Sequence, residues 1–329
     1  MPTRRRALLI LAALAGLAQL CLSLALMVGS VPIGPIEVLG TLLGQGADTT
    51  REVVCSLRLP RALAGFACGG LLALAGALLQ VLLRNPLADP YVLGISGGAG
   101  VGALLAIVVG LGAAGINALA FFGALAAMLV VFGLAHGEGG WTQSRLLLTG
   151  VIVAAGCGAL VTLMLSLAPE DRLRGMLFWL MGDLSQTGDP RLALLLLLAA
   201  LLAALPFARE LNLLARGADV AQALGVEVRV LRRGVYLVAS LATAAAVTHA
   251  GAIGFVGLIV PHLVRLATGN DQRLLLPASV LAGGSLLVVA DTLARTVVAP
   301  QQLPVGVLTA LIGVPVFLFL LGRAVPGRG

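Results

Sequence analysis

The chain has 329 residues, of which 60% are hydrophobic and only 11% charged, and its mean hydropathy is +1.08. A soluble domain of this length does not need so much apolar surface, so the composition predicts a protein that crosses a membrane several times. The net charge of +7 is the difference between 21 basic residues, all of them arginine, and 14 acidic residues. Because lysine is absent, ATP hydrolysis through a P-loop is excluded. The positive charge does not indicate a nucleic-acid partner, because the arginines are distributed along the chain as expected for a membrane protein.

The expected architecture is all-α, since 43 glycines accompany an aromatic fraction of only 4%, as in helices packed through small residues. Alternating short strands with aromatic girdles, which would indicate a membrane β-barrel, are absent from the sequence. Division at polar breaks, with about 20 residues per span, predicts a single polytopic transmembrane domain covering 1–329. Its ten spans are expected near 7–29, 62–83, 92–111, 114–135, 145–168, 190–208, 230–250, 252–267, 274–295 and 304–322.

The arginines predict the orientation of these spans. Arg4, Arg5 and Arg6 precede the first span without a clear cleavage site after it, which indicates an uncleaved anchor with a cytoplasmic N-terminus. With that orientation, fourteen arginines fall on the cytoplasmic side and seven on the outer side. This split obeys the positive-inside rule, so both termini and residues 211–233 are predicted to be cytoplasmic.

A proline-rich segment, 84–90, interrupts the apolar sequence between the second and third spans. Pro86 and Pro90 each block the continuation of a helix. The residues that follow, 93–102, are rich in glycine but include no basic residue, which argues against a phosphate-binding loop. Two interpretations stay open for them: backbone that lines a passage, or close packing between helices.

Residues 211–233 form the one long charged stretch in the middle of the chain. Apolar residues recur in it at near-helical spacing, and Gly225 stands where a helix would stop. The pattern predicts a short amphipathic helix at the membrane surface, suited to a groove in a partner, with a solvated loop as the alternative. The candidate residues of this surface are Leu213, Leu214, Arg216, Asp219, Ala221, Leu224 and Gly225.

The sequence contains no catalytic constellation. His136, His249 and His262 are far apart, and no metal or nucleophile motif accompanies them, so neither a metal site nor a cofactor is predicted. His249 is expected to be a packed histidine rather than a ligand for a chelate. Asp291 and Arg295 lie one helical turn apart near the outer end of the ninth span, where they can pair. Because the span interiors hold almost no other ionisable residue, the energy for any transport is expected to come from outside this chain.

A faint internal repeat is also visible. Gly76 is followed by Pro86, and Gly251 by Pro261, at the same spacing. Because the second and seventh spans run in opposite directions, the two halves would then be inverted copies. Chance explains two such short matches equally well in a chain so rich in alanine and glycine.

A series of motifs occurs in chain order over about residues 55–322. The motifs are Arg58-Leu59-Pro60-Arg61, residues 76–80, residues 85–90, Leu93-Gly94, residues 179–182, residues 251–258, residues 261–265, residues 291–295 and residues 303–306. Together they resemble the permease subunits of ABC importers for iron chelates, haem and vitamin B12.

The resemblance implies ten helices per subunit and a homodimer around a central path. It also implies two cytoplasmic ATPase subunits, a periplasmic binding protein and a place in the bacterial inner membrane. Residues 219–225 resemble the coupling motif of these importers, which usually begins with Glu-Ala-Ala and ends with this glycine. Asp219 and Val220 replace the glutamate and the first alanine here. The resemblance therefore implies that the partner of the surface helix predicted in residues 211–233 is an ATPase subunit.

Two positions depart from the family's pattern. Gln301-Gln302 stand where the family often has an acidic residue before the last span. Gln143-Ser144 stand where its cytoplasmic gate commonly has small hydroxylated residues before the fifth span. Asn85 and Leu87 fall at the same cytoplasmic end in the predicted topology. These four residues, Asn85, Leu87, Gln143 and Ser144, are the candidate gate, which copies from both subunits would close across the dimer axis.

Arg58 and Arg61 precede the second span and Arg295 ends the ninth, so all three are predicted at the outer face. Anchoring beside lipid headgroups is one interpretation. The resemblance favours docking, because permeases of this family hold the periplasmic protein by salt bridges from matching arginines to glutamates. Guanidinium groups suit that role, since they pair bidentately with carboxylates.

Together these features predict a non-enzymatic permease that imports a metal chelate from the periplasm, powered by a separate ATPase subunit. Ferric siderophore, haem and cobalamin all stay candidate substrates. An ion-coupled secondary transporter is the alternative function. A membrane-embedded enzyme is disfavoured by the lack of any reactive constellation.

Overall fold

The structure is a computed structural model that describes residues 4–29, 31–135, 142–185 and 187–324. All regular structure in these residues is helical, as predicted. Seven helical stretches among them are long and apolar enough to cross a membrane, and three shorter apolar helices complete the ten predicted spans. The ten helices are α1 (Arg4–Met27), α4 (Leu59–Leu82), α5 (Ile95–Val109), α6 (Ala113–Ala135), α7 (Gln143–Leu167), α9 (Arg191–Ala204), α12 (Val228–Ala250), α13 (Val256–Thr268), α14 (Gln272–Ala294) and α15 (Val305–Ala324).

Shorter helical segments lie between the spans. They are α2 (Pro35–Leu42), α3 (Asp48–Arg51), the π-helix η1 (Glu52–Arg58), the 3₁₀ turns η2 (Pro90–Leu93) and η3 (Leu205–Phe207), α8 (Glu170–Met181), α10 (Ala208–Arg216) and α11 (Ala218–Ala223). The sequence pattern does not predict α2, α3 or α8. A search for apolar runs of about 20 residues overlooks short helices of this kind.

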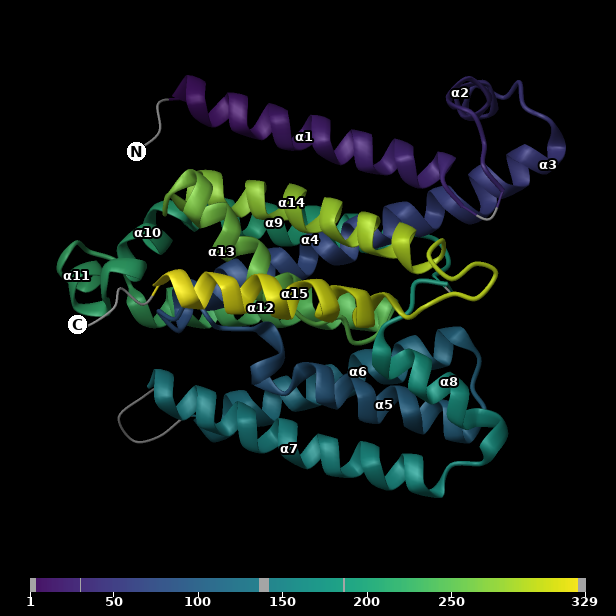
Figure 1. Cartoon of the computed structure of the whole chain (residues 1–329). Coiled ribbons are helices and arrows are strands. Elements are labelled where there is room, and N and C mark those ends of the chain that lie inside the picture. The colour runs from purple at the N-terminus through teal and green to yellow at the C-terminus, as the bar shows by residue number, and fades with distance from the viewer. Residues whose placement is uncertain (1–3, 30, 136–141, 186, 325–329) are drawn as a thin grey trace.

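The two ends of the helix bundle differ in what they carry (Figure 1). At one end lie α10 and α11, together with the start of α1 and the end of α15. At the other end lie α2, α3 and the connection from α14 to α15. We name these the inner end and the outer end, after the predicted orientation.

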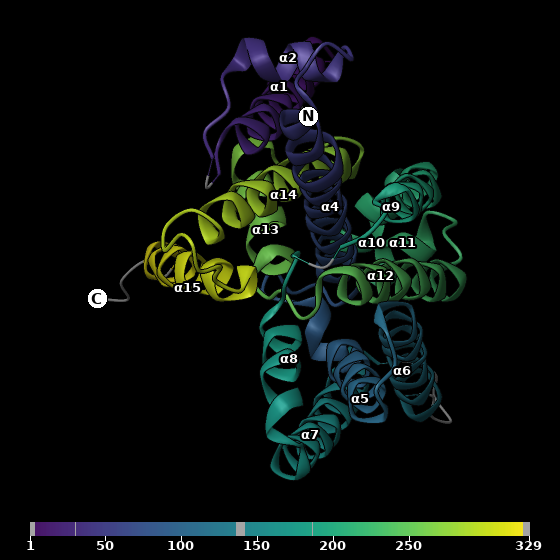
Figure 2. The ribbon, with the colours of Figure 1, turned by 90° about the vertical axis from the view of Figure 1, so that its right-hand side faces the viewer.

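The centre of the bundle is α4, which α9, α12, α13 and α14 surround (Figure 2). The most apolar stretch of this helical segment is 89% buried. Small residues allow such close packing: a Cβ atom added at Gly76 would lie 1.8 Å from the carbonyl oxygen of Gly257. The backbones of α4 and α13 therefore touch directly, as is typical of packed membrane helices.

The glycine-rich residues 93–102 lie mostly in α5, which packs against α6. A Cβ atom added at Gly98 would lie 2.4 Å from the carbonyl oxygen of Gly123 on α6. At Gly102 the distance to the carbonyl oxygen of Leu119 would be 2.0 Å. Of the two open interpretations, close helix packing is the one that the structure supports for these glycines.

The short helices α5 and α13 both begin inside the bundle, after irregular connections. The Tyr91 hydroxyl joins these connections: it donates to the carbonyl oxygen of Ile253 and accepts from the Ile253 amide, both at 2.8 Å. Irregular backbone at membrane depth is tolerated where protein buries it and satisfies its polar groups. Tyr91 performs that task here, and no sequence motif indicated it.

The two matches behind the proposed internal repeat do not occupy equivalent positions. Gly76 lies within α4, whereas Gly251 follows the last residue of α12 with φ +68°. Pro86 lies in the connection after α4, whereas Pro261 is inside α13. These matches therefore give no support to an inverted repeat.

Candidate functional site

The charged segment at the inner end forms two helices rather than the single predicted one. α10 ends at Arg216 and α11 begins at Ala218, with Gly217 between them at φ +138°. A side chain at that angle would be strained, so the glycine permits the break. Gly225 has φ +84° just after α11, which confirms the predicted helix stop.

Only some of the predicted surface residues face outward. Leu214 and Ala221 are 1% and 0% exposed, because they pack into the chain's own core. This corrects their predicted place in a partner's groove. Leu213 is half-buried, and Arg216, Asp219 and Gly225 are exposed. Val220 and Leu224, at 44% and 63% exposed, carry the apolar surface.

Asn212 fixes α10 against the start of α14. Its side-chain amide donates to Oδ1 of Asp271 at 2.9 Å, and its Oδ1 accepts from the backbone amide of Gln272 at 2.8 Å. The same Asp271 caps α14 by accepting from the amide of Arg273. α10 is thus hydrogen-bonded to the start of α14. A lone asparagine between leucines was the only sequence signal for this link.

The four candidate gate residues lie at the inner end, around the junction of α4 and α7. Nε2 of Gln143 donates to the carbonyl oxygen of Leu82 at 3.1 Å, so the start of α7 contacts the end of α4. Oδ1 of Asn85 accepts from the amide of Leu87 at 2.9 Å, which fixes the turn after α4. Ser144 and Leu87 are exposed beside this junction.

A polar pair that the sequence reasoning missed lies behind this junction. Gln80 is 3% exposed, accepts from Nη2 of Arg265 at 2.7 Å and donates to the carbonyl oxygen of Leu258 at 3.1 Å. The amide of Asn85 in turn donates to the carbonyl oxygen of Gln80 at 3.2 Å. α13 is therefore linked to the candidate gate through Gln80. A glutamine inside an apolar span was the available signal.

At the outer end, Arg58 is 5% exposed and bonded to its own chain. Nη1 donates to the carbonyl oxygen of Leu26 at 2.7 Å, and Nη2 donates to that of Val31 at 2.5 Å. These bonds hold the chain that follows α1 against α4. This corrects the prediction that Arg58 lies at the outer surface as a docking residue, because its guanidinium group is buried and bonded within the chain.

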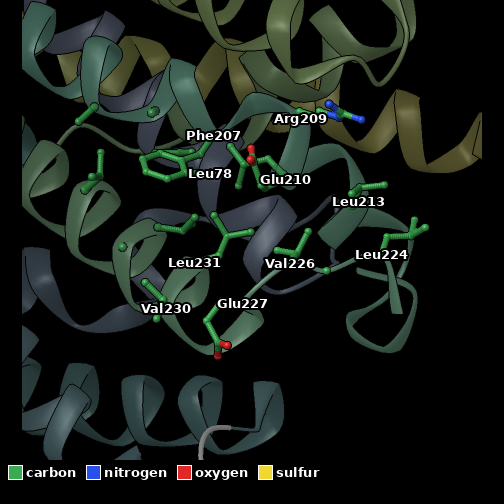
Figure 3. Close-up of a pocket in the computed structure, with 17 residues that line it drawn as sticks. Leu78, Phe207, Arg209, Glu210, Leu213, Leu224, Val226, Glu227, Val230 and Leu231 are labelled. Carbon is green, nitrogen blue, oxygen red and sulfur yellow. The ribbon is translucent and has the colours of Figure 1, made fainter. Parts of the chain in front are cut away.

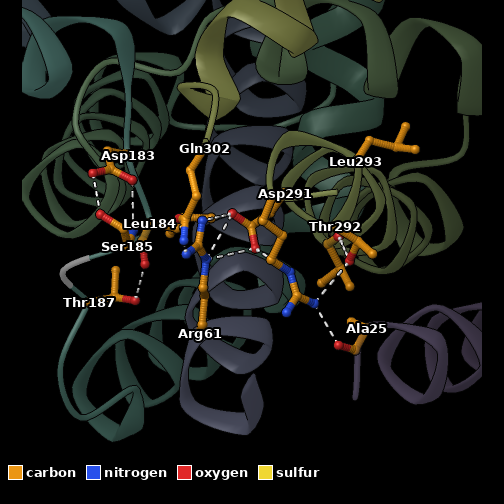
Figure 4. A network of polar contacts seen from close by, with 12 residues as sticks. Ala25, Arg61, Asp183, Leu184, Ser185, Thr187, Asp291, Thr292, Leu293 and Gln302 are labelled. Atoms are coloured by element: carbon orange, nitrogen blue, oxygen red, sulfur yellow. Dashed lines mark hydrogen bonds and ion pairs between the residues drawn. The ribbon is translucent and has the colours of Figure 1, made fainter. Parts of the chain in front are cut away.

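Arg61, Asp291 and Arg295 form a network at the same end, and Figure 4 shows Arg61 and Asp291 facing each other within it. The predicted pairing of Asp291 with Arg295 is confirmed, at 3.8 Å. Arg61 is the closer partner: its Nη2 lies 2.8 Å from Oδ1 of Asp291, and its Nε donates to both carboxylate oxygens at 3.0 and 3.1 Å. Sequence spacing did not suggest this contact, since 230 residues separate Arg61 from Asp291.

Positive charge exceeds negative charge in this network, because Asp291 faces both Arg61 and Arg295. Arg295 also donates from Nη2 to the carbonyl oxygen of Ala25 at 2.5 Å, and its side chain is 10% exposed. Arg61 donates from Nη1 to Oε1 of the exposed Gln302 at 2.9 Å. The edge of Arg61 next to Gln302 is therefore the part of the network nearest to solvent.

Of the three histidines, His249 and His262 lie within the described residues. Nδ1 of the half-buried His249 lies 3.0 Å from the carbonyl oxygen of Ala245 within α12, in agreement with a packed role. His136 lies outside the described residues. Within those residues, no group of three histidine, cysteine, aspartate or glutamate side chains could hold a metal ion.

Known proteins resemble the chain over nearly its whole length. Residues 9–323 match the FecCD transport family. A cobalamin import system permease protein of Halobacterium salinarum is 46% identical over 277 residues, which cover 83% of this chain and 74% of that protein. A hemin transport system permease protein of Yersinia pestis is 40% identical over 314 residues, covering 92% of this chain and 94% of the relative.

The fold is also known from a solved structure. A metal-chelate type ABC transporter in an inward-facing conformation superimposes with a TM-score of 0.83, at 30% identity, over 96% of this chain and 99% of the other. The predicted resemblance to ABC permeases is thereby confirmed. The chain belongs to the FecCD transport family.

Proposed function

We propose that this chain is the membrane permease of an ABC importer that carries a metal chelate (ferric siderophore, haem or cobalamin) across the bacterial inner membrane. It acts as a homodimer with two ATPase subunits and a periplasmic binding protein, and both of its termini are cytoplasmic. The observation that carries the proposal is the similarity, over most of the chain, to permeases named for cobalamin and hemin transport.

The alternative of an ion-coupled carrier is less well supported. Such a carrier needs an ionisable group that is free to bind and release its ion inside the membrane. Asp291 lies near the outer end and is already paired with two arginines. Asp89 lies in the connection before α5, where its carboxylate accepts from the Tyr91 amide at 2.7 Å as the cap of η2. Both carboxylates are therefore committed to the structure.

Reconstitution in liposomes distinguishes the two functions. The permease is assembled with its ATPase and binding protein, and uptake of labelled cobalamin, haem and a ferric siderophore is measured. We expect uptake of one of them on addition of ATP without any ion gradient. Uptake that follows a proton or sodium gradient and ignores ATP would support the carrier instead.

The ATPase is proposed to bind at α10 and α11. Val220 and Leu224 provide the apolar contact, with Leu213 beside them and Arg216, Asp219 and Gly225 in the exposed surroundings. Because α10 is tied to α14 through Asn212 and Asp271, a shift of this surface on nucleotide binding would reach the spans. Hydrogen-bonded links between helices are one physical route by which coupling passes between two sites.

The homodimer is proposed to form along α7 and to place the gate on its axis. Only 11% of the most apolar stretch of α7 is buried, and the exposed face includes small residues at Ala155, Gly156 and Ala159. Small residues allow two membrane helices to approach closely. The exposed Ser144 begins the same helix, so the two copies would lie near each other.

Crosslinking tests both parts of this arrangement. A cysteine replaces Ser144 in a chain whose four native cysteines are changed to alanine. We expect a crosslinked dimer whose yield depends on whether ATP is bound, because the gate opens and closes with the nucleotide state. Thr162→Cys, on the same helix toward its outer end, is the control for position. A yield that is unaffected by nucleotide would argue against a gate at Ser144.

Docking of the binding protein is proposed to use Arg61, with Arg295 behind it. Nη1 of Arg61 is bonded to the exposed Gln302, and the network of two arginines and one aspartate carries a net positive charge. A carboxylate on the partner could therefore pair with Arg61 without displacing Asp291. Arg58 supports the site by fixing the neighbouring chain.

A further inference from the structure

A cavity of about 660 Å³ lies at the inner end, between α12 and the helical segment formed by α9, η3 and α10 (Figure 3). Its volume falls in the range of about 300–1,000 Å³ that is typical of small-molecule sites. Most of its lining is apolar, from Leu78 at the back to Phe207 and Val230 near the surface. Leu213, Leu224 and Gly225 of the proposed ATPase surface also line this cavity, whereas the rest of its lining has no part in the proposed transport mechanism.

Apart from α4, the helices that line the cavity lie at the periphery of the bundle. Figure 2 shows α9 and α12 together at the periphery of the molecule, with α10 and α11 between them. On α12 the lining residues Val230, Gly234 and Val238 follow one face at intervals of four residues. They extend about 12 Å from the inner end toward the middle of the bundle, at about 1.5 Å per residue. An extended hydrocarbon chain fits such a stripe.

Gly234 makes the groove deep. It is exposed, and a Cβ atom added to it would meet no atom within 4 Å. A larger residue at this helical position would therefore fill the groove without colliding with the protein. Because glycine has no side chain, the groove stays open between Val230 and Val238.

The inner part of the cavity is polar and carries charges of both signs. Arg209, Glu210 and Glu227 line it, and Figure 3 shows the Glu210 carboxylate beside Leu78 and Phe207, with Arg209 above it in this view and Glu227 well below it, beyond Val226 and Leu231. Oε2 of Glu210 is buried and has no hydrogen-bond partner. A buried carboxylate oxygen without a donor is unfavourable, so a ligand that donates to it would be stabilised.

We propose that this cavity binds an inner-leaflet aminophospholipid of the phosphatidylethanolamine class. One acyl chain lies along Val230, Gly234 and Val238, the primary ammonium donates to Oε2 of Glu210, and the phosphate pairs with Arg209. Two carboxylates against one guanidinium disfavour a purely anionic headgroup. A quaternary choline headgroup has no N–H to donate, so it leaves Glu210 unsatisfied. The lipid would connect α12 to the segment that carries α10 and α11.

The test is native mass spectrometry of the purified full-length permease after delipidation. Phosphatidylethanolamine, phosphatidylcholine and phosphatidylglycerol of identical acyl composition are added separately. We expect one tightly retained phosphatidylethanolamine per chain, with at least tenfold weaker retention of the other two. The measurement needs no transport, so its failure would leave the import proposal untouched.

Variants assign the lipid to this cavity. Gly234→Leu should reduce retention at least tenfold by filling the groove, while Gly16→Leu on α1 should leave it unchanged, since a Cβ atom at Gly16 also meets nothing within 4 Å. Glu210→Gln keeps the groove and should abolish the preference for phosphatidylethanolamine over phosphatidylcholine.

Three results would overturn the proposal. One is equal retention of all three lipids, and another is retention that Gly234→Leu does not change. The third is loss of the lipid when the ATPase binds, which would assign the cavity to the subunit interface.

Discussion

The two ends of the molecule use arginine in opposite ways. At the outer end Arg58, Arg61 and Arg295 are largely buried and bonded to their own chain, and Arg172 donates to the carbonyl oxygen of Ile107 at 2.9 Å. At the inner end Arg216 is exposed on the surface of α10. Under the predicted orientation, the positive-inside rule accounts for the small number of arginines at the outer face. The four outer arginines named above hold the fold, whereas Arg216 lies on the surface where we propose that the ATPase binds.

The largest expected effect comes from removing the negative charge at the outer end. Asp291→Asn should destabilise the permease by about 3–5 kcal/mol, because it leaves Arg61 and Arg295 in a buried site without their shared carboxylate. Denaturant unfolding of the purified protein measures this change. Asp189→Asn is the control: Asp189 pairs with Arg191 at 3.7 Å, but their side chains are 64% and 86% exposed. It should cost about 0–1 kcal/mol. Equal effects of both variants would contradict the structural role of the network.

At the inner end, a substitution that adds a negative charge should weaken assembly with the ATPase without lowering the stability of the permease. Leu224→Glu adds a charge to a side chain that is 63% exposed, so folding should be unaffected. Loss of its apolar contact should weaken ATPase binding by about 1.5–3 kcal/mol, or roughly ten- to a hundredfold. Copurification and substrate-stimulated ATP hydrolysis measure this loss.

Leu214→Glu is the matched comparison for Leu224→Glu. Leu214 is 1% exposed, so a carboxylate there would be buried without a partner, and the permease itself should be destabilised. If Leu224→Glu leaves the ATPase bound, the coupling surface is elsewhere. If Leu214→Glu folds normally, the assignment of α10 to the core is wrong.

Periodicity and charge counting predicted the ten spans because each span is a long apolar run that needs no distant partner to define it. The same reasoning placed the break at Gly225 correctly. It merged α10 with α11, because an apolar repeat continues across Gly217 and only the backbone angle reveals the break. It also placed Leu214 and Leu224 on one surface, although the fold buries one and exposes the other.

Contacts between distant residues were beyond sequence reasoning. Residues four positions apart on one helix, such as Asp291 and Arg295, are neighbours in space, so their pairing can be predicted from the sequence. Arg61 meets Asp291 only because α4 packs against α14, and the Tyr91 hydroxyl meets Ile253 only because two connections fold into the bundle. Without an expected packing arrangement, such polar residues in the sequence have no identifiable partner.

The smallest expected effect comes from a substitution that neutralises the net positive charge of the network at the outer end. Gln302→Glu places a second carboxylate where Oε1 of Gln302 now accepts from Nη1 of Arg61 at 2.9 Å. The new ion pair is near solvent, so stability should rise by no more than about 1 kcal/mol. Docking of the binding protein should weaken, because the edge of Arg61 that a partner carboxylate would use is then occupied. Gln301→Glu is the control, since the exposed neighbouring side chain adds the same charge without this bond. Binding-protein affinity measured at low and high salt should fall severalfold for Gln302→Glu only, and the difference should shrink as salt screens the charges. An equal loss for both variants would indicate a general effect of added negative charge, and Arg61 would then have no special part in docking.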